Sequence, residues 1–166
     1  MIIYHPLTDV FHAMNRCMII LKYIENSNYK LKGGVMNIER YRIYDYYLLF
    51  PNDIRNISLP SSYRGFKTLK YQNKFNTIKN QKTVFKSLKN IQDICINNLI
   101  FYNIIDSKEF KEKQVLKLIS STSEITFDKN SIDDLVLKLF SEYFDKINVK
   151  ELKQRTKLTE HRYEQS

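Results

Sequence analysis

Residues 38–51, IERYRIYDYYLLFP, decide how this chain folds. Four of these fourteen residues are tyrosines, and Pro51 predicts the end of a helix, because the residue before a proline avoids the helical conformation. The first turns keep a polar side, whereas residues 46–50 are all apolar or aromatic. A helix that is apolar all round has to be covered on every side. Two interpretations stay open: a central core helix in which Asp45 pairs with Arg42, or a helix that also holds a protein partner.

The composition is that of a folded protein. A chain of 166 residues with 43% hydrophobic and 13% aromatic residues is predicted to form one domain with a real core. Its three glycines and three prolines are too few for a turn-rich β sandwich. We see no signal peptide and no apolar run long enough for a membrane span, so we expect a cytoplasmic protein without membrane contact. Cys17 and Cys95 stand in apolar helical patterns and are expected to be buried thiols.

The spacing of apolar residues predicts a mainly helical chain. A polar loop containing Gly33 and Gly34 separates the first two helices, and Asn148 with Glu151 predicts the cap of a short last one. Long helices are predicted at about residues 9–25, 38–50, 84–102 and 131–143.

The order of the elements resembles that of a winged-helix domain. The stretches KQVLKLI (113–119) and EITF (124–127) predict a β-hairpin between the third and fourth long helices. We therefore expect a mainly α, formally α+β, winged-helix-like domain with one hairpin wing. A small α+β domain with a solvated lysine face is the alternative. The expected domain spans residues 1–147, with a basic insertion at 51–83, and a charged helix and tail follow at 148–166.

The positive charge is concentrated in one part of the sequence. No acidic residue stands between Asp53 and Asp93, and the nine basic residues there equal the whole net charge of +9. Such a segment attracts a polyanion or an acidic protein face, and the sequence leaves both open. The candidate nucleic-acid-binding residues are Arg64, Lys67, Lys70, Lys74, Lys79, Lys82, Lys86 and Lys89.

The motifs of common catalytic sites are missing from the sequence. There is no phosphate-binding loop and no nucleophile elbow. His5, Asp9 and His12 lack the spacing of a zinc site, and the Glu109-x-Lys111 half of a nuclease motif is expected in a charged turn. We therefore expect no catalytic residue, no metal and no cofactor, and a protein that is not an enzyme.

Three stretches together resemble the middle component of bacterial ABC-three-component systems. They are IIYHPLTDVFHAMNRCMIIL (2–21), the opening stretch, and FKSLKNIQDICINNLIFYNIID (85–106). The stretch at 51–82 is more basic than the family pattern, and Tyr41 replaces its usual aliphatic residue. The residues that match the pattern are His5, Pro6, Leu7, Phe11, Arg16, Glu39, Arg40, Asp45, Tyr46, Tyr47, Leu48, Leu49, Pro51, Ile91 and Gln92.

The resemblance implies a role in a complex. Such subunits accompany an SMC-like ABC ATPase and an effector, often a nuclease, as in Lamassu-type antiphage defence. It implies that this chain bridges the two, with DNA contacted through the complex, and that Asp45 is a structural anchor. Candidate partner-binding residues are Tyr41, Tyr44, Tyr47 and Phe11, with one of each neighbouring pair on the tyrosine-rich helix expected to point outward. The alternative is a free-standing winged-helix transcription regulator that dimerises on a palindromic DNA site.

Overall fold

The structure is a computed structural model that describes residues 9–26, 31–32, 34–71, 80–119 and 134–159. These residues are mainly helical. The α-helices are α1 (Val10–Asn26), α2 (Ile38–Leu49), α3 (Gln81–Phe101), α4 (Ser107–Lys113), α5 (Asp134–Glu142) and α6 (Val149–Thr156), and the 3₁₀ helices are η1 (Pro51–Asn56), η2 (Ser61–Lys67) and η5 (Phe144–Lys146). The helices predicted in these regions are thereby confirmed.

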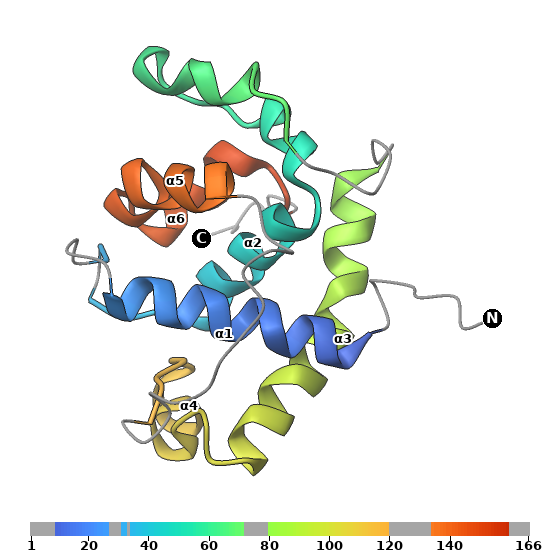
Figure 1. Ribbon diagram of the computed structural model, residues 1–166, viewed down its shortest axis with the longest axis vertical. Helices are drawn as coiled ribbons and strands as arrows, with labels where there is room; N and C mark the ends of the chain where they lie inside the picture. The colour runs from blue at the N-terminus through green and yellow to red at the C-terminus, as the bar shows by residue number, and fades with distance from the viewer. Residues whose placement is uncertain (1–8, 27–30, 33, 72–79, 120–133, 160–166) are drawn as a thin grey trace, which may run out of the picture.

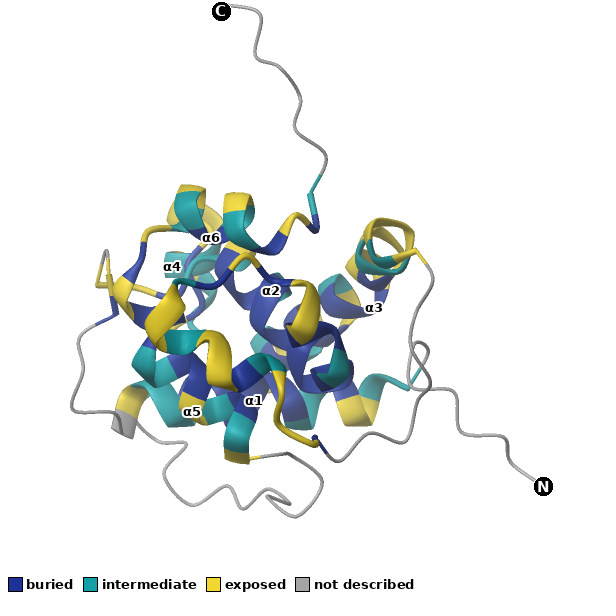
Figure 2. Ribbon diagram, turned by 90° about the horizontal axis from the view of Figure 1, so that it is seen from above, coloured by how far each residue is buried: buried dark blue, intermediate teal, exposed yellow. Residues whose placement is uncertain are grey.

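Helix α2 lies at the centre of the molecule. It contacts α1, α3, α5 and α6 as well as η1 (Figure 1). All residues from Tyr41 to Leu49 except Arg42 are buried, as is Arg40. The prediction that this helix must be covered on all sides is confirmed, and Figure 2 shows its buried colour surrounded by the more exposed outer helices.

Short polar side chains begin several of these helices. Asn37 Oδ1 accepts a 2.8 Å hydrogen bond from the backbone N–H of Arg40, and Asn80 caps α3 in the same way. Asn148 Oδ1 accepts a 2.8 Å bond from the N–H of Glu151 at the start of α6, where the sequence predicted a cap. These bonds satisfy backbone donors that the first turn of a helix leaves free.

The segment after α2 is more ordered and more buried than its weak sequence pattern predicts. It forms η1 and η2, and these contact each other while η1 also contacts α2. Ile54 and Ile57 are fully buried and belong to the same hydrophobic core as α2. The basic insertion therefore begins as part of the core.

The predicted hairpin wing is not found among the residues that the structure describes. The first predicted strand makes only isolated antiparallel bridges, Asn37 with Val115 and Ile105 with Leu118. The second predicted strand, EITF, lies outside the described residues. The prediction of a charged turn around Glu109 is wrong, because Glu109 lies in helix α4. Asp106 Oδ1 accepts a hydrogen bond from the Glu109 N–H and caps the start of this helix, which forms despite the high charge of the stretch.

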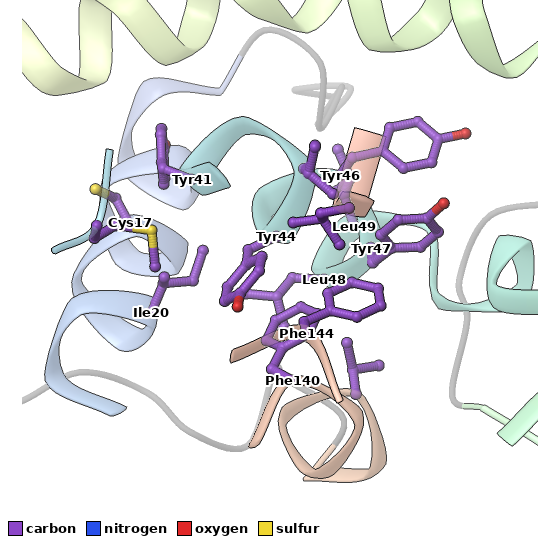
Figure 3. Close-up of a cluster of buried hydrophobic side chains, with 14 of the residues drawn as sticks. Cys17, Ile20, Tyr41, Tyr44, Tyr46, Tyr47, Leu48, Leu49, Phe140 and Phe144 are labelled. Carbon is purple, nitrogen blue, oxygen red and sulfur yellow. The ribbon is translucent and has the colours of Figure 1, made fainter. Parts of the chain in front are cut away.

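The C-terminal elements close the core over α2. Phe140 of α5 stacks on Tyr44 at 4.3 Å between ring centroids, and Phe144 of η5 packs against both (Figure 3). Leu152 of α6 is fully buried as well. Among the described residues, no helix is long and apolar enough to cross a membrane.

Candidate functional site

The four tyrosines of α2 are all completely buried. Tyr41, Tyr44, Tyr46 and Tyr47 are each 0% exposed, so the prediction that some of them point outward is wrong. A helical wheel shows the directions of side chains but not how many neighbours a helix has. Here α1, α3 and the C-terminal helices all pack against α2, so that none of the four rings reaches the surface. Figure 3 shows Tyr44 next to Phe140 and Phe144.

Arg16, Asp45 and Gln92 meet in a buried cluster between α1, α2 and α3. Arg16 Nε donates a 2.6 Å hydrogen bond to Asp45 Oδ1, and Gln92 Nε2 donates a 2.9 Å bond to Asp45 Oδ2. The side chain of Asp45 is 0% exposed and that of Arg16 is 7% exposed. All three residues belong to the family pattern, and their shared role is to join three helices through one carboxylate.

The core interpretation expected Asp45 to pair with Arg42. This expectation is wrong, because Asp45 binds Arg16. Arg42 turns instead toward α3, where Nη1 donates to Gln92 Oε1 at 3.2 Å and Nη2 to Asp93 Oδ1 at 2.6 Å. Arg42 and Asp45 are three residues apart on α2, a spacing that allows an ion pair, but Arg16 on α1 is a better-placed cation for Asp45. Gln92 thus links the buried carboxylate to a pair at the protein surface.

Two opposing effects act on Arg16. Burial by itself lowers the pKa of the guanidinium, while the charge and hydrogen bond of Asp45 raise it, and the net shift is upward. The Arg16 guanidinium is therefore charged at all ordinary pH values. A buried charge of this kind is tolerated only because its partner is in hydrogen-bonding contact.

Arg40 forms a second buried connection on the other side of α2. Its Nη1 donates a 2.7 Å hydrogen bond to the carbonyl of Phe144, and its Nη2 donates a 2.6 Å bond to the carbonyl of Ile147. Tyr44 Oη donates a 2.5 Å bond to Asp145 Oδ1, and burial raises the pKa of that carboxyl above its ordinary value. Sequence reasoning gave no role to Arg40, because it stands among the polar residues of the first turns, where a charged side chain is normally exposed.

The remaining polar groups of α2 differ in how well they are satisfied. Tyr46 Oη donates a 2.6 Å hydrogen bond to Asp53 Oδ2, which fixes the start of η1. The hydroxyl of Tyr47 is buried with no hydrogen-bond partner among the described residues. Burial raises the pKa of Tyr47 well above its ordinary value, with the nearby charge of Asp53 adding to the shift.

Cys17 and Cys95 are free, fully buried thiols, as expected. The Tyr41 hydroxyl lies 3.9 Å from Cys95 Sγ. Burial raises the pKa of the Cys17 thiol well above its ordinary value, and the neighbouring Cys95 adds to the shift. Thiols in such surroundings are inert, because the reactive species is the thiolate.

The basic candidates fall into two groups in the structure. Arg64, Lys67 and Lys70 lie on η2 and just after it, while Lys82, Lys86 and Lys89 lie on α3. Figure 1 shows η2 and α3 as separate elements at the outside of the molecule. All except the half-buried Lys67 are exposed, and Lys74 and Lys79 lie outside the described residues.

The partner candidate Phe11 is placed differently from the tyrosines. It stands near the start of α1 and is 81% exposed. Of the four predicted partner-binding residues, it alone presents its ring at the surface of the described structure. A docking role for Tyr41, Tyr44 and Tyr47 would require α2 to be uncovered first.

The described residues hold no group of three or more histidines, cysteines, aspartates or glutamates that could bind a metal ion. Asp106 caps α4, and Asp93 is bound by Arg42. His12 lies on the exposed side of α1, whereas His5 is outside the described residues. The polar groups described above join helices to one another, and charged and aromatic residues lie on the surface.

One comparison with known proteins identifies the family. Searches of curated proteins and of solved structures gave no match. The model of the family described as ABC-three component (ABC-3C) system Middle Component 5 matches residues 2–164. This match spans α1 to α6, including both buried polar clusters. The chain therefore belongs to the Middle Component 5 family of ABC-three-component systems.

Proposed function

We propose that this chain is a non-catalytic accessory subunit that bridges an SMC-like ABC ATPase and an effector in a bacterial antiphage defence complex of the Lamassu type. The observation that carries the proposal is the family match over residues 2–164, since a middle component implies partner proteins. The absence of catalytic motifs from the sequence supports the non-catalytic part.

The internal structure fits such a role. Asp45 and Arg40 use buried polar contacts to fix helices that come from both ends of the sequence around α2. A subunit that transmits position between two partners has to keep its surfaces in a constant arrangement. A core that is cross-linked by hydrogen bonds on two sides of one helix provides this rigidity.

DNA contact is a further part of the proposal and rests on the first basic group. Arg64 and Lys70 are exposed and Lys67 is half-buried, next to one another around η2. If these residues neutralise phosphates, DNA affinity falls steeply with salt for all sequences alike. Replacing the three by glutamate in the assembled complex then weakens binding to duplexes of any sequence. The winged-helix arrangement is not needed for this contact.

Coexpression with the neighbouring genes tests the bridging role. The tagged chain is produced with the ABC ATPase and the effector of its own operon, and complexes are isolated with and without this chain. We expect a complex of all three in which the effector is recovered with the ATPase only when this chain is present. If the ATPase and effector associate equally well without it, the bridging role is wrong. If the isolated chain dimerises and binds one palindromic duplex, it is a transcription regulator instead.

A further inference from the structure

Helix α3 has an outer face along its whole length. Leu88, Cys95 and Leu99 bury the inner face against the core. On the opposite side the residues follow one another at spacings of three or four: Lys82, Lys86, Asn90, Ile94, Asn97 and Phe101. All six are exposed, and the face is about 29 Å long at 1.5 Å per residue. Figures 1 and 2 show α3 at the edge of the molecule with exposed residues on the side away from α2.

The C-terminal half of this face carries apolar and aromatic residues on either side of the exposed Asn97. Phe101 is 78% exposed, Tyr102 is 63% exposed, and their rings meet edge to face at 5.4 Å between centroids. Ile94 lies two turns earlier on the same side and is also exposed. Scattered exposed apolar residues are ordinary, but two exposed aromatic rings in contact with each other form a patch of the kind that anchors protein interfaces, and Ile94 adds an exposed apolar side chain farther along the same face.

The N-terminal half of the same face is positively charged. Lys82, Lys86 and Lys89 are all exposed. The helix has a single acidic residue, Asp93, and its carboxylate is bound by Arg42 at 2.6 Å. The three lysine charges therefore have no carboxylate of their own helix left to neutralise them.

The combination of charge and apolar surface indicates what kind of molecule covers this face. A DNA duplex would match the lysines, but its charged backbone offers little to Ile94 and Phe101. A second copy of this chain would match the aromatic patch, but each copy carries a net charge of +9 and would bring like charges together. A protein surface with an apolar groove next to carboxylates satisfies both halves at once.

We infer that the outer face of α3 docks a partner protein subunit that offers an apolar groove for Phe101, Tyr102 and Ile94 and carboxylates for Lys82, Lys86 and Lys89. The inference rests on the proposed function, and it deepens that function by naming the surface and the chemistry of the partner. The α3 lysines are thereby assigned to protein recognition, separately from the basic group around η2.

The test uses the coexpressed complex and two variants of the outer face. One variant combines Phe101→Ser with Tyr102→Ser, and the other combines Lys82→Glu, Lys86→Glu and Lys89→Glu. Because these side chains are exposed, both variants should melt like the wild type. We expect each to lower affinity for the ABC ATPase or the effector at least about tenfold, and the lysine variant to reduce the salt dependence of that affinity.

Matched controls come from other surfaces of the same chain. Val35→Ser with Leu69→Ser removes two exposed apolar residues, and Lys108→Glu, Lys111→Glu and Lys117→Glu reverse three exposed charges. Both controls should leave the affinity within about twofold of wild type.

A photo-crosslinking residue at position 101 reports the partner directly. The crosslinked peptide should come from the ATPase or effector and contain apolar residues next to Asp or Glu. Three results would overturn the inference: full affinity in both outer-face variants, loss of duplex binding alone in the lysine variant, or a crosslink to a second copy of this chain. Failure of the wild type to recover either subunit would instead refute the proposed function.

Discussion

Replacing Asp45 with alanine tests whether the cluster of three helices stabilises the fold. In the variant, the Arg16 guanidinium keeps its charge but loses the carboxylate at 2.6 Å, and its side chain is only 7% exposed. An unpaired buried charge costs about 3–5 kcal/mol. The 2.9 Å hydrogen bond from Gln92 is also lost, which adds about 1 kcal/mol.

The expected loss is therefore about 3–6 kcal/mol of unfolding free energy, a large part of the roughly 5–15 kcal/mol that a domain has. For a chain of this size each kcal/mol lowers Tm by about 2–4 °C, so Tm should fall by about 6–24 °C. Urea unfolding followed by far-ultraviolet circular dichroism measures the loss, and an unchanged m value shows that the shift in midpoint reports a change in stability.

Two further variants isolate the buried pair. Asp45→Leu combined with Arg16→Met removes both charges and should recover most of the loss, because replacing a whole buried pair by apolar residues is often nearly neutral. Asp93→Asn breaks an ion pair whose aspartate side chain is 45% exposed and should cost no more than about 1 kcal/mol. The reasoning is refuted if Asp45→Ala costs no more than Asp93→Asn. It is also refuted if the double variant loses as much as the single variants Asp45→Leu and Arg16→Met added together.

Three other outcomes follow from the structure. Tyr44→Phe should cost about 1–3 kcal/mol of unfolding free energy, because it breaks the hydrogen bond to Asp145. Tyr47→Phe should be neutral or stabilising, because it removes a buried hydroxyl that has no partner among the described residues. Chemical unfolding of both variants gives the comparison. Burial raises the pKa of Asp145 above its ordinary value of 3.8, so the native state binds the proton of this carboxyl more tightly than the unfolded chain does. The stability that this group contributes therefore falls as pH rises above 3.8. The stability of the wild type relative to Asp145→Asn should therefore increase on acidification toward pH 3.8, and the opposite slope in pH-dependent melting curves would contradict the assignment. Phe11→Ser should leave Tm within about 2 °C, since the ring is 81% exposed, while reducing recovery of the ABC ATPase; equal recovery would exclude Phe11 from the interface.

The features that the sequence predicted correctly depend on local signals. Asn148 and Glu151 are three residues apart, and their capping bond forms within one helical turn. The burial of α2 likewise follows from its own side chains, because residues 46–50 leave no polar side to face water. Such features need no knowledge of distant parts of the chain.

The features that the sequence did not predict depend on residues far apart in it. Asp45 has a cation three positions away in Arg42, yet it binds Arg16, which is 29 residues distant. The prediction that some tyrosines point outward came from a helical wheel, which shows one helix without its neighbours. The helices packed around α2 decide that these tyrosines are buried. The family pattern did contain Arg16, Asp45 and Gln92, but a pattern gives matched residues without saying which of them touch.

The contacts of Arg40 affect how this protein folds while it is being synthesised on the ribosome. Its guanidinium binds carbonyls that come 104 and 107 residues later in the chain. When α2 leaves the exit tunnel, these acceptors and the ring of Phe140 have not yet been synthesised, because translation proceeds from the N-terminus. Until they emerge, the tyrosine-rich helix stays uncovered on one side and is exposed to chaperones and to other nascent chains. Folding of this helical protein is therefore expected to finish only after translation has passed Ile147, and to be slower than that of helical bundles held by local contacts.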